Sequence, residues 1–221
     1  MVSNYNFSCE ASEGGNIGYG NCNKDVGNTR GVIFTPKGKT FKVSELNTFV
    51  SQLKTLSTAD AWGNRLQFVK DIMGAELANT EAQTSTYGYG TAIETEPEKI
   101  GRTFTLRGTC AAKALKNIKN MHATYDVMFV HDGNVINATA GTLNGEAIIK
   151  GFSLDNLVIG AYNETVGTSN LAGFNVTITI ASRDEWDNSF QLVATDGNVM
   201  TELKSLINVN LAYYKAAVVV P

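Results

Sequence analysis

Cysteine and histidine are scarce in this chain, and their positions fit neither a disulfide framework nor a zinc site. The sequence has three cysteines, Cys9, Cys22 and Cys110, and two histidines, His122 and His131. Three cysteines are too few to hold a small secreted fold together, although Cys9 and Cys22 share one segment and could pair. The spacing between the cysteines and the histidines matches no tetrahedral zinc motif, so we expect no structural metal.

Charged residues are sparse as well. They make up 18% of the chain, with a formal net charge of -3, whereas soluble domains typically carry about 25%. The lysines and arginines are scattered singly, which argues against a protein that grips the phosphates of nucleic acid. A surface with few charges indicates that part of it contacts other protein.

No stretch of the sequence resembles a secretory signal or a membrane span. The opening residues, MVSNYNFSCEASEGG, contain neither a basic segment nor an apolar one. No run approaches the roughly 18 apolar residues that cross a bilayer. Hydrophobic residues nevertheless reach 43% of the chain, which is enough to bury a sizeable core. We expect a folded protein that stays in the cytosol of its producer and has no membrane partner.

Motifs that carry catalysis are missing. The sequence contains no Gly-x-Ser-x-Gly elbow, no His-Glu-x-x-His pair, no phosphate-binding loop and no dinucleotide fingerprint. Asp184, Glu185 and Asp187 surround Trp186 and could serve a glycosidase, which needs two carboxylates beside a sugar. A polar turn between two strands explains these residues more simply, so we expect no enzymatic activity and no cofactor.

The stretch MFVHDGNVI, residues 128–136, sets a histidine beside an aspartate. Asp-Gly and Gly-Asn are strong signals for a tight turn between two antiparallel strands. Neighbouring residues in a strand point to opposite faces, so His131 and Asp132 are poorly placed to act as a catalytic pair. The sequence therefore predicts a hairpin corner, with His131 as the last residue of a strand.

Alternating apolar residues predict strands through much of the second half of the chain. In the segment TYDVMFV, Tyr125, Val127 and Phe129 fall on one face, and Met128 and Val130 fall on the other. The segment FNVTITIAS alternates in the same way, with its apolar residues expected to point inward. Strands of this kind belong in a buried sheet.

Helical spacing is present in three places. Ser44 is expected to cap a helix whose apolar residues repeat through Leu56, and further helices are expected at 109–120 and 197–209. The sum predicts an α+β, β-rich class: an antiparallel β-sandwich or barrel with two or three short flanking helices and extended arms. The apolar ending AAVVV is expected to be paired or buried, because such a strand aggregates when exposed.

Two segments are expected to be the extended arms. Residues 1–30 are rich in Gly and Asn and form an N-terminal arm, while residues 31–221 form a single β-rich structural domain. That domain carries a long polar arm at about 75–100, which is either an exposed hairpin or a strand that adds to another subunit's sheet. The candidate contacts between subunits are Tyr19, Tyr87, Gly88, Tyr89 and Gly90.

From Arg65 onward the order of the patterns resembles a known family. RLQFVKDI is followed by a Thr- and Glu-rich stretch with YGYGT, and then by RTFTLRG and a helix. YDVMFVHDGNVINAT, IIKGFSLDNLVIG and FNVTITIASRDEWDNSF complete the series. In this order the chain resembles the phage tail-tube (major tail protein) family, as found among structural proteins of Bacteroidetes phages and prophages.

The resemblance implies a virion protein that is assembled in the cytoplasm of a bacterial host. Members of the family have a β-barrel or sandwich flanked by a helix, with an extended arm that reaches the next ring. Their rings, commonly hexameric, stack into a tube, contact other virion proteins and pass DNA through the lumen without binding it specifically. The glycine-rich N-terminal segment and the apolar C-terminal strand are not features that the family predicts.

The alternative is a binding module, either a capsid decoration protein or a glycan-binding protein. It would expose Trp186, or the pair Tyr87 and Tyr89, as an aromatic platform. Ring formation distinguishes the two interpretations, because a decoration or glycan-binding module would be a monomer or a trimer.

Overall fold

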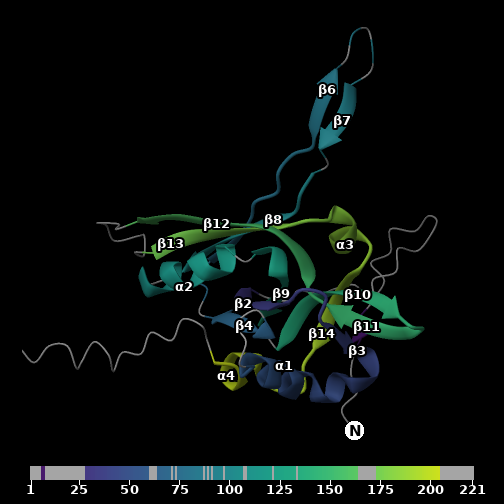
Figure 1. The fold of residues 1–221 in the computed structure, drawn as a ribbon, viewed down its shortest axis with the longest axis vertical. Helices are drawn as coiled ribbons and strands as arrows, with labels where there is room; N and C mark the ends of the chain where they lie inside the picture. The colour runs from purple at the N-terminus through teal and green to yellow at the C-terminus, as the bar shows by residue number, and fades with distance from the viewer. Residues whose placement is uncertain are drawn as a thin grey trace, which may run out of the picture.

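In the computed structural model, the described residues form one large antiparallel sheet, a separate hairpin and several short helices (Figure 1). The structure describes residues 6–7, 28–59, 64–70, 72, 74–86, 88, 90, 92–96, 98–106, 109–120, 122–132, 134–163 and 173–204. This arrangement confirms the predicted β-rich α+β class. The predicted C-terminal strand lies outside the described residues, as do Cys9 and Cys22.

The elements are short, and most are joined by tight connections. In chain order they are β1 (Asn6–Phe7), β2 (Thr29–Pro36), β3 (Thr40–Lys42), η1 (Val43–Thr48), α1 (Phe49–Ser57), β4 (Gln67–Lys70), β5 (Gly74–Leu77), β6 (Gln83–Thr86), β7 (Ala92–Glu96), β8 (Gly101–Leu106), α2 (Thr109–Asn120), η3 (His122–Thr124), β9 (Tyr125–His131), β10 (Val135–Leu143), β11 (Glu146–Lys150), β12 (Phe152–Asn163), β13 (Gly173–Ile180), α3 (Arg183–Asp187), β14 (Phe190–Ala194) and α4 (Val199–Glu202).

The large sheet has two portions that share the strand β12. The first portion has β9 at its centre, with β2 and β4 on one side and β10, β14 and β1 on the other, and β11 and β3 extend it from β10. β12 begins beside β9, where Phe152 pairs with Val127. It then leaves β9 and pairs along its length with β13. The second portion therefore runs β12, β13, β8 and β5.

Two hydrophobic cores lie on opposite faces of the first portion. One core fills the space between the two portions and includes Leu115 and Ile118 of α2. The other core lies between the first portion and the helical segment η1–α1, with α4 beside it. Figure 1 shows this layering, with β12, β13 and β8 above, β2, β9 and β10 in the middle, and α1 and α4 below.

β9 has apolar side chains on both faces because both of its faces are covered. Tyr125, Val127 and Phe129 belong to the core between the two portions. Met128 and Val130 belong to the core above α1. All seven residues of β9 are buried, which confirms the two-faced pattern predicted from the sequence.

The first helical segment begins differently from the prediction. Residues Val43–Thr48 form a 3-10 helix before α1, and Lys42 and Thr48 occupy the two N-cap positions without a side-chain cap. The prediction that Ser44 caps a helix was therefore wrong, because the tighter 3-10 turn places Ser44 inside the helical segment. The buried face is as predicted, since Phe49 and Leu53 are buried in the core.

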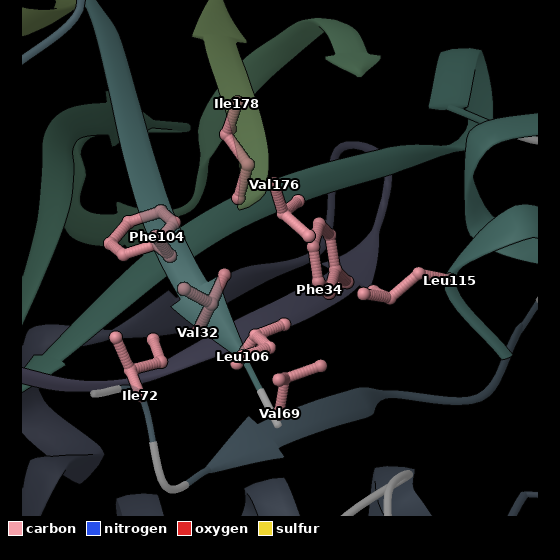
Figure 2. A pocket seen from close by; sticks show the side chains of 9 residues that line it. All are labelled: Val32, Phe34, Val69, Ile72, Phe104, Leu106, Leu115, Val176 and Ile178. Carbon is pink, nitrogen blue, oxygen red and sulfur yellow. The ribbon is translucent and has the colours of Figure 1, made fainter. Parts of the chain in front are cut away.

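A small apolar cavity lies in the core between the two portions (Figure 2). Its volume is about 10 Å³ and its lining is made up of hydrophobic side chains from β2, β4, β8, β13 and α2, with Ile72. The lining residues are Val32, Phe34, Val69, Ile72, Phe104, Leu106, Leu115, Val176 and Ile178. Apolar cavities of this size stay dry. The lining atoms therefore lack packing partners on one side.

Filling this cavity is expected to stabilise the protein. Val176→Ile adds one carbon at its wall, and we expect the free energy of unfolding in urea to rise by about 0.5–2 kcal/mol. The matched control is Val127→Ile, because Val127 is fully buried in the same core but does not line the cavity. That substitution overpacks the core and should cost about 1–3 kcal/mol. Equal losses in both variants would contradict the assignment of free space beside Val176.

Candidate functional site

The most prominent surface feature is the hairpin of β6 and β7, here called the arm, which projects from the body (Figure 1). Its register runs from Gln83 opposite Glu96 to Thr86 opposite Ala92. β6 and β7 pair with each other, and neither pairs with a further strand that the structure describes. An isolated two-stranded hairpin is only marginally stable in water. Among the described residues, the arm thus lacks the neighbouring strands that support the large sheet.

The five predicted contact residues are only partly placed. Gly88 and Gly90 are exposed and lie in the segment that joins β6 to β7. Gly88 has a φ of 60°, a left-handed conformation that glycine adopts without steric cost. Tyr19, Tyr87 and Tyr89 lie outside the described residues.

The arm is acidic. Residues 71–98 contain no lysine and no arginine, whereas Glu81, Glu94 and Glu96 lie in or next to the hairpin. A run of one sign of charge on a projecting hairpin disfavours pairing with another arm of the same kind. It favours docking against a basic group.

Backbone pairing continues from the body into the arm base, which consists of residues 78–80 and 98–101. The Ala78 N–H donates to the Gly101 carbonyl at 2.9 Å, and Thr80 and Lys99 form an isolated bridge. The side-chain oxygen of Asn79 accepts from the Gly101 N–H at 3.2 Å. These bonds extend the β5–β8 ladder outward and set the direction in which the arm leaves the body.

Two ion pairs join the arm base to the second portion of the sheet and to α3. The Lys99 ammonium lies 3.0 Å from a carboxylate oxygen of Asp155 on β12. The Arg183 guanidinium at the start of α3 pairs with Glu98. Both pairs are partly exposed, so each contributes at most about 1 kcal/mol. Their effect is to hold the arm base against the body.

A cleft of about 260 Å³ opens beside β5. It is lined by residues from the start of β2, the end of β9 and the strands β5 and β8. They are Asn28, Thr29, Ala75, Glu76, Leu77, Arg102 and His131. Leu77 is 72% exposed, and β5 is an edge strand of the described sheet. This cleft, here called the Arg102 cleft, therefore combines an edge strand of the described sheet, an apolar side chain and a cation.

Arg102 is held by aromatic rings. Its guanidinium carbon lies 4.5 Å from the centre of the Trp186 ring and 4.8 Å from that of Phe129. Nη1 donates to the Thr29 hydroxyl at 3.4 Å, while Nε is buried and has no hydrogen-bond partner among the described residues. Burial lowers the pKa of the Arg102 guanidinium to about 10, because desolvation disfavours its charged form.

Arg102 was not among the predicted site residues, although the sequence contains a signal for it. In RTFTL, the residues Arg102, Phe104 and Leu106 alternate and so share one face of the strand. Phe104 and Leu106 are buried in the core, which places the arginine on the inward face as well. An arginine at an inward position of an alternating strand is rarely buried without a partner.

The predicted hairpin corner is confirmed. β9 ends at His131 and β10 begins at Val135, with the two residues paired and Asn134 in the left-handed conformation. Asp132 forms an exposed ion pair with Arg30 at 2.6 Å. His131 is buried, at 4% exposure, because β2 and β10 both cover the end of β9.

The acidic cluster lies on a short helix, α3, so the predicted polar turn was wrong. Glu185 accepts hydrogen bonds from the backbone N–H and the hydroxyl of Ser153 at 2.7 and 2.9 Å, and from Lys150 at 2.9 Å. Asp187 accepts from Arg183 at 2.8 Å. Glu185 therefore joins α3 to β11 and β12, while Asp187 is paired within the helix.

Trp186 does not form an exposed aromatic platform. The side chain is half-buried and packs against the core between the two portions. Its ring centre lies 5.1 Å from that of Phe190 and 5.3 Å from that of Phe152. The indole therefore supports the core and Arg102.

Comparisons with known proteins identify no relative. A scan against protein-family models, a search of curated proteins and a search of solved structures each found no match. Among the described residues that could be searched, no three His, Cys, Asp or Glu side chains are grouped so as to hold a metal ion. No helix in the same part of the chain is long and apolar enough to cross a membrane.

Proposed function

We propose that the protein is a virion structural protein that assembles with copies of itself into rings, stacked as a tail tube that guides the passage of DNA. The observation that carries this proposal is the arm. Its base is fastened to the body by backbone pairing and ion pairs, while β6 and β7 project beyond the sheet. A hairpin whose strands pair with no other described strand is suited to strand addition or docking on a neighbour.

Several features support a tube subunit rather than a binding module. The order of the sequence patterns resembles the tail-tube family, and the β-rich body with a helix packed on the sheet agrees with that resemblance. The formal net charge of -3 suits a lumen that DNA crosses without specific binding. The burial of Trp186 weighs against a glycan platform built on that residue. The partners are then other copies, in rings that are commonly hexameric, and further virion proteins.

Shortening the arm tests this proposal. Residues 82–97 are replaced by Asn-Gly, which closes a two-residue hairpin turn and keeps the Thr80–Lys99 bridge and Glu98. We expect a folded monomer, because the removed residues lie outside both cores. The wild type is expected to form rings or tubes. Size exclusion with light scattering, and negative-stain microscopy of the same fractions, measure the assembly state of the variant and of the wild type.

A matched control lengthens a different exposed hairpin. Inserting Gly-Ser between Asn144 and Gly145, in the turn between β10 and β11, should leave assembly unchanged, since surface turns tolerate short insertions. Rings formed by the arm-shortened variant would show that the arm is not the connector. A wild-type protein that stays monomeric at every concentration would contradict self-assembly altogether.

A further inference from the structure

Arg102 differs from Arg30 and Arg183 in that it has no acidic partner among the described residues. Arg30 is paired with Asp132, and Arg183 is paired with Asp187 and Glu98. Within the part of the chain that the structure describes, no carboxylate forms a salt bridge with Arg102. Glu76 also lines the cleft, yet it forms none of these pairs.

An inward-facing cation without a partner is a costly arrangement. Taking a charge out of water is unfavourable unless a group of opposite charge or several hydrogen bonds compensate for it. The rings of Phe129 and Trp186 position the guanidinium, but one hydrogen bond to Thr29 uses only one of its five N–H donors. The remaining donors match a carboxylate, which binds a guanidinium with two parallel hydrogen bonds.

The arm carries acidic residues, whose charge is opposite to that of Arg102. β7 carries Glu94 and Glu96 in a segment without basic residues. The arm of the same chain cannot supply them. Glu96 and Glu94 precede Arg102 by six and eight residues (102 - 96 and 102 - 94), or about 20–26 Å of extended strand. The arm also points away from the body (Figure 1).

We propose that the Arg102 cleft receives a glutamate carboxylate from the arm of a second copy of this chain. The inference rests on the proposed self-assembly and names the surface on which the arm docks. Each copy then offers an arm on one side and a cleft on another, which is a head-to-tail contact that closes into a ring when the rotation permits. Leu77 and the open edge of β5 lie beside Arg102 and provide apolar and main-chain contacts for the incoming strand.

The decisive variant is Arg102→Met, which removes the charge but keeps an unbranched side chain against the two rings. We expect it to fold with an unchanged or higher melting temperature, because it replaces an uncompensated cation with an apolar group. The concentration needed for assembly should rise by at least about 30-fold, as for loss of one partner of a buried charge pair. A purely structural role for Arg102 would instead lower the melting temperature and leave the assembly concentration unchanged.

Mixing two assembly-defective variants provides the strongest test. The arm-shortened protein keeps the cleft, and the Arg102→Met protein keeps the arm. We expect each to be monomeric alone and the mixture to form a 1:1 complex by light scattering. In a second mixture, the Glu94→Gln/Glu96→Gln protein replaces Arg102→Met as the source of the arm. This mixture with the arm-shortened protein should not form the complex. The matched control is Glu146→Gln, an exposed carboxylate on β11 paired with Lys42, which should leave assembly unchanged.

The outcomes separate the two proposals. Normal assembly by Arg102→Met, or a mixture that stays monomeric, would overturn the cleft as the receptor while the arm could still be the connector. Assembly by the arm-shortened protein would overturn the arm as the connector, and with it the cleft as its receptor, whereas a wild-type protein that stays monomeric would overturn the proposed function itself. Arg102→Met can also be combined with Glu94→Gln/Glu96→Gln in one protein. If the losses of assembly strength from the two changes simply add, the result would contradict a direct pair between these side chains.

Discussion

Phe129→Ala is expected to destabilise the fold by about 3–5 kcal/mol, the range found when a buried aromatic side chain is truncated. Phe129 lies in the middle of β9 and is fully buried. Its ring centre lies 5.9 Å from that of Phe104 on β8 and 6.1 Å from that of Phe152 on β12. The side chain thus connects the first portion of the sheet to two strands of the second. Removing it leaves a cavity between the two portions of the sheet, which closes only if the portions shift toward each other.

Urea denaturation followed by circular dichroism measures this loss. The control is Leu143→Ala at the exposed end of β10, where the side chain is 49% exposed and the expected loss is below about 0.5 kcal/mol. Phe129 also supports the guanidinium of Arg102 at 4.8 Å, so the variant should assemble poorly even when it is folded. A loss below about 1 kcal/mol would show that the contact between the two portions does not depend on this ring.

Local patterns in the sequence were sufficient for several parts of the fold. The pattern of TYDVMFV predicted a strand with apolar residues on both faces, and β9 is such a strand, buried along its whole length. The Asp-Gly-Asn stretch required a tight turn, and β9 and β10 pair across it. Helical spacing at 109–120 corresponds to α2 with the same bounds. In each case the signal lies within one short segment of the sequence.

Features that depend on distant residues could not be predicted. β12 pairs first with β9 and then with β13, and nothing within its own sequence indicates where it changes partner. Whether the sheet closes as a sandwich or a barrel depends on such long-range pairings. The surroundings of Arg102 also depend on distant residues, because Phe129 of β9 and Trp186 of α3 are brought against its guanidinium by the fold. The acidic composition of the arm was visible in the sequence, whereas the cation that matches it was not.

Gly101→Ala is expected to change the direction of the arm while leaving its sequence intact. Gly101 begins β8, and a Cβ at this position would lie 2.2 Å from the carbonyl oxygen of Ala78. The obstacle is a backbone atom, so the segment that follows β5 and carries Ala78 must move away from β8. We expect a loss of about 1–3 kcal/mol in stability. We also expect at least a tenfold rise in the concentration needed for assembly, equivalent to about 1.4 kcal/mol.

Gly141→Ala is the matched control for this substitution. The added Cβ on β10 would meet only the Ile148 side chain, at 3.8 Å, and alanine lowers the entropy of the unfolded chain. This variant should therefore be neutral or stabilised by up to about 1 kcal/mol, with normal assembly. If Gly101→Ala assembled as well as Gly141→Ala, the direction of the arm would not matter, and docking would depend on its composition alone. If it is folded but fails to assemble, the backbone junction between Ala78 and Gly101 is what aims the glutamates of β7 at the cleft of the next copy.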